Sequence, residues 1–208
     1  MLDVHAPSHT PNGARDFFIH LFTITIGLLI ALGLEVGVEA FHHRHQRLEA
    51  EAMIRDEIKS NGEKIEQGET QFKEELDGMN QVLQTLDSLS QGKSAGVLEE
   101  KDFVFHQSPM QDAAWRTAAS TGALSYMDYA LVERFSEAYK EQDQLEAMEK
   151  QTLEDYLLLL PVLSHHSKDM DPERAKQALV YARQAVAHLN GMYFIALGTL
   201  GSYHEALQ

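Results

Sequence analysis

The longest apolar run in the chain lies near the N-terminus and has the length of a membrane-spanning helix. No Lys or Arg occurs from Asp16 to Phe41, and two threonines are the only polar residues between positions 21 and 34. A threonine hydroxyl bonds to its own preceding helical turn, so it costs little in lipid. A helix over residues 17–38 is about 33 Å long, enough to cross a hydrocarbon core of about 30 Å. The pattern predicts a transmembrane helix over residues 16–41.

Two other interpretations of this run, a secretory signal peptide and a buried helix of a soluble protein, fit the sequence less well. A signal peptide needs a basic start and a small-residue cleavage site. One Arg and two Asp precede the apolar core, and no A-x-A-like site follows it. A buried soluble helix is seldom apolar on every side over this length. Residues 1–15, with two Pro and one Gly, are expected to form a flexible tail.

Residues 42–208 show helical periodicity and no second membrane span. We predict three long helices, over about residues 42–90, 111–160 and 172–206. Apolar residues of the first helix recur at heptad spacing, as in a coiled coil, at Ile58, Ile65, Phe72, Met79 and Leu86, with Leu76 and Leu83 between them. Asn61, Gly62 and Gly68 interrupt this seam, so the first helix is expected to be thin or broken there.

The second helical region carries its own boundary signals. Gly122 is expected to turn the chain, and Ser125 to Asp128 matches an S-x-x-D capping pattern. Pro161 is expected to end the helix. The polar stretch over residues 140–152 is expected to face water.

The third helix has the clearest pattern. Asp171, Pro172 and Glu173 supply an N-cap, a proline in the first turn and an acidic start. Apolar residues then alternate by four and three along one face, at Ala175, Leu179, Ala182, Val186, Leu189, Tyr193, Ala196, Leu200, Tyr203 and Leu207. The predicted fold class is therefore all-α, with a single N-terminal transmembrane helix continuing into a long-helix antiparallel bundle.

Composition excludes several classes of function. The 208 residues include 17 Lys+Arg and 32 Asp+Glu, and the net charge of −15 argues against a nucleic-acid-binding surface. Without Cys the chain has no disulfides or thiolate metal sites. The sequence contains no P-loop, dinucleotide-binding, nucleophile-elbow or H-E-x-x-H motif. We expect a non-enzymatic protein without cofactor or metal.

Two glutamates lie one helical turn apart at the C-terminal end of the predicted span. Ionised carboxylates in lipid are costly unless they reach water or a partner. Glu35 and Glu39 are therefore either an interfacial flank at headgroup level or a carboxylate ring of an oligomer that binds a cation or moves protons. The apolar run continues past Glu35 through residues 36–38, which makes Glu35 the stronger candidate for an ion site.

Small residues in the span favour close helix packing. Gly33 and Gly37 form a G-x-x-x-G, and Gly27 and Ala31 form a similar pair earlier in the helix. This spacing predicts a homo-oligomer, although glycine is also common in membrane helices that do not associate. Glu35 lies roughly 200° around the helix from Gly33, so only a ring with a lumen satisfies both the glycine contact and a hydrated carboxylate.

A basic, titratable cluster follows the span. His42, His43 and His45 surround Arg44, and we expect them to contact lipid headgroups. A pH sensor and a metal site are the alternatives, but Glu39 and His42 form a single E-x-x-H, which is too few ligands for a metal. 

Further along, the second helical region is rich in aromatic residues. These residues are Trp115, Tyr126, Tyr129, Phe135 and Tyr139, with Arg116 beside the first. We expect them to pack in the core; a ligand pocket lined by them is the alternative.

Two blocks of the chain resemble a family of uncharacterised bacterial single-span inner-membrane proteins. The first block is ITIGLLIALGLE followed by HHRHQR and EAEAMIRDEIKSN, and the second is AWRTAASTGALSYMDYALVERFSEAYKEQ. The resemblance covers about the first 65 residues and residues 110–142. It implies a location in the bacterial inner membrane and carries no activity. On the positive-inside rule, Arg44, Arg47 and the basic residues after them favour a cytoplasmic over a periplasmic soluble domain.

These features together predict a membrane-anchored, self-associating helical scaffold or partner-binding protein. Its expected partners are the lipid bilayer, further copies of the chain and an unidentified protein, with no nucleic acid. One alternative is a membrane-anchored helical bundle that senses a ligand. Another is an oligomeric cation or proton pathway that uses Glu35.

Overall fold

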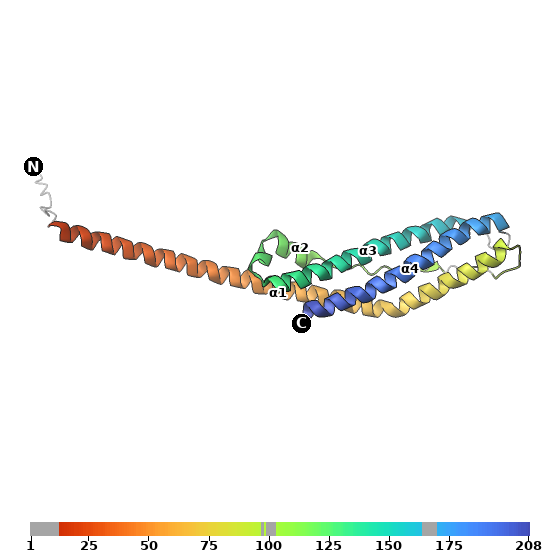
Figure 1. Ribbon diagram of the computed structural model, residues 1–208, viewed down its shortest axis with the longest axis horizontal. Helices are drawn as coiled ribbons and strands as arrows, with labels where there is room; N and C mark the ends of the chain where they lie inside the picture. The colour runs from red at the N-terminus through yellow and green to blue at the C-terminus, as the bar shows by residue number, and fades with distance from the viewer. Residues whose placement is uncertain (1–12, 97, 99–102, 164–169) are drawn as a thin grey trace, which may run out of the picture. The chain divides into compact units, whose positions relative to one another are not determined.

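The computed structural model describes residues 13–96, 98, 103–163 and 170–208. Its elements are α1 (Gly13–Ser90), α2 (Ala113–Ser120), the 3-10 helix η2 (Ala123–Tyr126), α3 (Tyr129–Leu163) and α4 (Pro172–Leu207) (Figure 1). The described part of the chain contains no strand, and the predicted all-α fold class is confirmed. The chain divides into two compact units, Met1–Leu48 and Glu49–Gln208.

In the first unit, the described residues form the N-terminal part of α1. An 18-residue window of this helix has a mean hydropathy of 2.3 and is entirely unburied, so α1 is long and apolar enough to cross a membrane. The hydroxyls of Thr23 and Thr25 donate to the carbonyls of Ile19 and Leu21 at 2.9 and 2.8 Å. Both hydroxyls are therefore satisfied within the helix, as a lipid environment requires.

The helix starts earlier than predicted. It begins at Gly13 and has Asp16 in its first turn, where a carboxylate stabilises the positive end of the helix dipole. The prediction of a flexible tail over residues 1–15 is therefore wrong for residues 13–15. The rest of that predicted tail, residues 1–12, lies outside the described residues.

Within the second unit α1 runs unbroken to Ser90, so the expectation of a thin or broken helix is wrong. The three interrupting residues lie at packing contacts. Asn61 is fully buried, a Cβ on Gly62 would lie 3.5 Å from the Tyr203 ring, and a Cβ on Gly68 would lie 3.7 Å from Ser108. Tertiary contacts at these positions outweigh their weak helix propensity.

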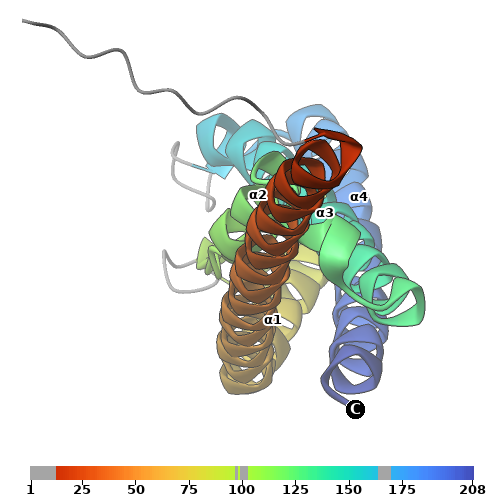
Figure 2. The same ribbon diagram turned by 90° about the vertical axis from the view of Figure 1, so that its left-hand side faces the viewer.

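The helices of the second unit pack side by side, and α4 runs opposite to α1 and α3. At one end of α4 the Ala206 carbonyl accepts a hydrogen bond from Arg55, and further along Tyr193 stacks on Phe72 at 5.1 Å. These contacts make α4 antiparallel to α1, and Figures 1 and 2 show α3 beside α4. Because the chain returns along α1 before entering α2, α1 and α3 run parallel to each other and antiparallel to α4.

The core consists of two apolar clusters. One is built around Ile54, Ile58, Phe135, Tyr139 and Tyr203. The other is built around Met79, Leu86, Leu145, Leu159 and Leu189. Every residue of the predicted α4 stripe is buried or half-buried, so that face prediction is confirmed.

The predicted helix over residues 111–160 is divided into α2, η2 and α3. Gly122 has a φ of 75° in the left-handed region, which confirms the predicted turn. Asp128, and not Ser125, caps α3: its Oδ1 accepts the backbone N–H groups two and three residues ahead at 3.0 and 3.4 Å. The S-x-x-D pattern therefore points to the wrong residue as the cap, because Ser125 lies within η2.

The two helix ends flanking residues 164–169 also differ from expectation. Pro161 lies inside α3, which ends at Leu163. A proline removes one hydrogen bond of the helix but does not stop the last turn from forming. The helix therefore continues for two residues past Pro161. Asp171 occupies the N-cap position of α4, but its side chain makes no capping hydrogen bond. Pro172 at the start and Glu173 in the first turn are as predicted.

Candidate functional site

A segment of the second unit without regular secondary structure, residues 104–112, runs along α1; we call it the strap. Side chains of α1 hold its backbone. The N–H of His106 donates to Oε1 of Glu75 at 2.6 Å, and Nδ1 of His106 lies 2.7 Å from the same oxygen. Nζ of Lys64 donates to the Pro109 carbonyl at 2.8 Å. The strap is therefore positioned by side chains distant in sequence.

The strap ends in a buried polar junction. Asn61 pairs with the backbone of Gln111, donating to its carbonyl at 2.7 Å and accepting its N–H at 2.9 Å. Gln142 accepts from Asn61 at 3.0 Å and from the Tyr203 hydroxyl at 2.6 Å. Burial raises the pKa of Tyr203. Since Gln142 is 1% exposed, the expectation that residues 140–152 all face water is wrong.

Glu57 binds the start of α2 in the same way. Its Oε2 accepts the Ala114 N–H at 2.9 Å and its Oε1 accepts the Tyr139 hydroxyl at 2.6 Å. Asp112 occupies the N-cap position without a side-chain cap, so a carboxylate of α1 serves the positive end of α2 instead. Burial, reinforced by Glu57, raises the pKa of Tyr139 well above its usual value.

The aromatic residues of this region mainly pack in the core. Phe135 and Tyr139 are buried, and Trp115 stacks on Tyr139 at 5.3 Å. Tyr126 and Tyr129 are 40% and 81% exposed and do not belong to the core. A cavity in the second unit is lined by other residues.

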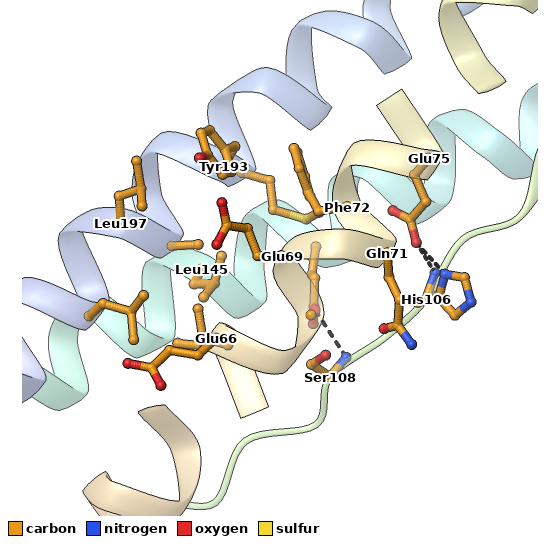
Figure 3. A pocket seen from close by; sticks show the side chains of 16 residues that line it. Glu66, Glu69, Gln71, Phe72, Glu75, His106, Ser108, Leu145, Tyr193 and Leu197 are labelled. Carbon is orange, nitrogen blue, oxygen red and sulfur yellow. Dashed lines mark hydrogen bonds and ion pairs between the residues drawn. The ribbon is translucent and has the colours of Figure 1, made fainter. Parts of the chain in front are cut away.

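That cavity, of about 110 Å³, lies among α1, α3, α4 and the strap (Figure 3). Its apolar wall includes Ile65, Phe72, Leu145, Met192, Tyr193, Ala196, Leu197 and Leu200. Its polar wall is acidic, with Glu66, Glu69, Glu75 and Glu149 joined by Gln71, His106 and Ser108. Glu149 of α3 accepts the Ser108 N–H at 3.2 Å. Two nearby backbone N–H groups of the strap are therefore bound by glutamates of different helices, Glu75 of α1 and Glu149 of α3.

Three carboxyl groups around the strap have raised pKa values. Burial is the main cause for Glu75, where bonds from His106 act in the opposite direction. Burial is also the main cause for Glu149 and Glu146, and in Glu149 the neighbouring negative charges of Glu146 and Glu75 add to it. The folded protein therefore holds protons on these groups more tightly than the unfolded chain does.

This difference predicts a pH dependence of stability. Above the ordinary carboxyl value of 4.5 and below the raised values, the folded state binds more protons than the unfolded state, so the free energy of unfolding falls as pH rises. Glu149→Gln is expected to raise the melting temperature at about pH 7.5 more than at about pH 5. The amide still accepts from Ser108 without carrying a charge. Calorimetry of the full chain in detergent at the two pH values checks this.

Glu133→Gln is the matched control for that variant, since Glu133 is exposed at the start of α3. It should shift the melting temperature little at either pH. An equal gain from Glu149→Gln at both pH values would contradict a raised pKa at Glu149.

The candidate residues of the first unit lie on the surface of α1. Glu35, Glu39 and His42 are exposed, and a Cβ on Gly27, Gly33 or Gly37 would meet nothing within 4 Å. Ala31, between these glycines, is exposed too. Glu39 lies 3.9 Å from His43, and the rings of His42 and His43 are 6.3 Å apart. The roles assigned to these residues, and to His45, stay predictions.

No group of three or more His, Asp or Glu suited to a metal ion occurs in the described ranges. No known protein family, curated protein or solved structure matches the chain. The family resemblance of the two sequence blocks is therefore still a prediction.

The sequence contains a pattern that points to the strap, although the heptad seam obscures it. Glu57, Asn61, Lys64, Gly68 and Glu75 are spaced by four, three, four and seven residues along α1. This is the spacing of one helix face, and each of these residues bonds to or faces residues 106–115. A polar stripe of this kind beside an apolar seam indicates a bound backbone segment.

Proposed function

We propose that the protein is a membrane-anchored, self-associating helical scaffold of the bacterial inner membrane, with no enzymatic activity. The observation that carries the proposal is the first unit's apolar helix, of which an 18-residue window is wholly unburied. Exposing that much apolar surface to water is unfavourable by about 25 cal/mol for each Å². A bilayer removes this cost, and the all-helical second unit remains outside the lipid to bind partners.

Self-association through the span is supported by its open small-residue face. A second helix can approach Gly33 and Gly37 closely, because no other described residue fills the space beside them. In lipid such close approach gains dispersion contacts and weak hydrogen bonds. A pathway for cations or protons through Glu35 is the alternative that needs a ring of copies.

The charges beside the span support a cytoplasmic location of the second unit. Arg44, Arg47, Arg55 and Lys59 follow the apolar run, whereas Arg15 alone precedes it within the described residues. Positively charged flanks stay in the cytoplasm, so the second unit is proposed to be cytoplasmic.

Gly33→Ile together with Gly37→Ile is expected to dissociate the assembly, because the branched side chains hold two helices apart. We expect the dissociation constant in detergent to rise at least about tenfold, equivalent to about 1.4 kcal/mol. Light scattering and analytical ultracentrifugation of the extracted full chain give the particle mass. Gly201→Ile, at an exposed glycine of α4 with nothing within 4 Å, is the matched control.

Glu35→Gln separates the scaffold from the pathway. A scaffold keeps its mass and carries no ion flux in liposomes with either side chain. Ion flux that is present in the wild type and lost in Glu35→Gln would contradict the scaffold function and support the ion pathway. A monomeric wild-type particle would remove self-association from the proposal.

A further inference from the structure

We infer that the cavity among α1, α3, α4 and the strap binds a small organic ammonium ion, with its charge at Glu69 and its apolar body against Phe72 and Tyr193. This site is independent of self-association by the span. It supplies the binding chemistry that a ligand-sensing bundle requires.

The charge of the cavity selects a cation. Four glutamates line it, and no Lys or Arg is among the described lining residues. Glu75 and Glu149 are engaged by the strap. Glu66 and Glu69, three residues apart on α1, also line the cavity and are exposed. An anion would meet repulsion from this wall, whereas a cation is attracted to its negative charges.

The apolar wall selects a cation with a hydrocarbon part. The rings of Phe72 and Tyr193 stack at 5.1 Å with an interplanar angle of 20°. Stacking covers one face of each ring, and the rest of the ring surface, with the neighbouring side chains of Met192, Ala196 and Leu197, offers an apolar surface to the carbon atoms. A hydrated metal ion would gain nothing from these residues.

The size of the cavity limits the ligand. A single water needs roughly 10–15 Å³ of such space, so about 110 Å³ admits a group of several non-hydrogen atoms. This matches a short alkylammonium or a trimethylammonium head.

Glu69 already binds an ammonium group of the protein itself. Nζ of Lys73 donates to its Oε1 at 2.8 Å, and this bond with Glu69 raises the pKa of Lys73. The pair is exposed, with Lys73 at 63% and Glu69 at 51%, so it is weak. A ligand ammonium ion at the cavity therefore competes with Lys73 for the same carboxylate.

The test uses choline and its neutral isostere 3,3-dimethylbutan-1-ol as probes, titrated calorimetrically into the full chain in detergent. We expect saturable binding of choline and at least about tenfold weaker binding of the alcohol. Glu69→Gln should weaken choline binding about threefold, because the carboxylate is half exposed, whereas Lys73→Gln should strengthen it by freeing Glu69. Glu133→Gln, which removes the same charge far along α3 from the lining residues, should change nothing.

Opposite effects of the two neighbouring substitutions distinguish a ligand site from a general effect of surface charge. Equal affinity for both probes would overturn the inference, as would equal affinities of wild type, Glu69→Gln and Lys73→Gln for choline. Melting curves establish that each variant is folded, and both substituted side chains are exposed.

The ammonium group has two sources, a free solute or a lipid headgroup. Choline is titrated against the chain in nanodiscs of phosphatidylcholine and of phosphatidylglycerol. Weaker apparent binding in phosphatidylcholine assigns the site to a headgroup, and equal binding assigns it to a free ammonium ion.

Discussion

Replacing Leu189 by Asp is expected to lower the free energy of unfolding of the second unit by about 3–5 kcal/mol. Leu189 is 0% exposed and lies in the cluster with Met79, Leu86 and Leu159. A carboxylate there has no partner and must stay ionised at a high cost or take up a proton. Thermal and urea unfolding of the full chain, followed by circular dichroism, measures the loss.

Lys176→Asp is the control on the same helix. Lys176 is exposed on α4 and pairs with Glu173 at 2.6 Å in the first turn. An exposed pair of this kind is worth about 0–1 kcal/mol, so this variant should melt close to wild type. Similar losses from the two variants would mean that the buried face of α4 is misassigned.

Asn61→Ala is expected to detach the end of the strap and to lower the free energy of unfolding by about 2–4 kcal/mol. The substitution removes both hydrogen bonds that Asn61 makes with Gln111 and the one it makes with Gln142. The Gln111 N–H then lacks its carboxamide acceptor, and the Gln142 carboxamide loses a donor at a buried position. Hydrogen exchange should accelerate over residues 104–112 more than in the body of α4.

Asn190→Ala is the matched substitution. Asn190 is exposed and donates only to the Val186 carbonyl of its own helix at 2.8 Å, among the described contacts. We expect little change in stability and none in exchange over the strap. Unchanged strap exchange in Asn61→Ala would show that the apolar contacts of the strap hold it without the junction.

The two clusters and the strap explain how an acidic chain forms a stable helical unit. Carboxylates that would otherwise repel each other accept backbone N–H groups: Glu57 at α2, Glu75 and Glu149 at the strap. Each bond satisfies a donor that regular secondary structure leaves open. The raised pKa values of Glu75 and Glu149 show that burial outweighs these favourable bonds.

Side-chain periodicity is enough to predict most of the local structure of this protein. The apolar run, the heptad seam of α1 and the stripe of α4 depend on side-chain periodicity, which repeats within one helix and needs no knowledge of its neighbours. Leu189 and Tyr203 were placed on the buried face from spacing alone, and Gly122 was placed at a turn because glycine adopts a positive φ without strain.

The roles of the buried polar residues depend on contacts between helices that are far apart in the sequence. Asn61 weakens a helix locally, and its role depends on Gln111 and Gln142, which are 50 and 81 positions away. Glu69 and Tyr193 meet at the cavity only because α4 runs antiparallel to α1. Periodicity shows which face of a helix is buried, and the polar stripe of α1 indicates a face that binds a backbone segment, but neither pattern identifies the distant partner. The helices and the polar stripe of α1 can therefore be predicted from the sequence, whereas the residues that meet in the strap, the junction and the cavity depend on how the helices pack.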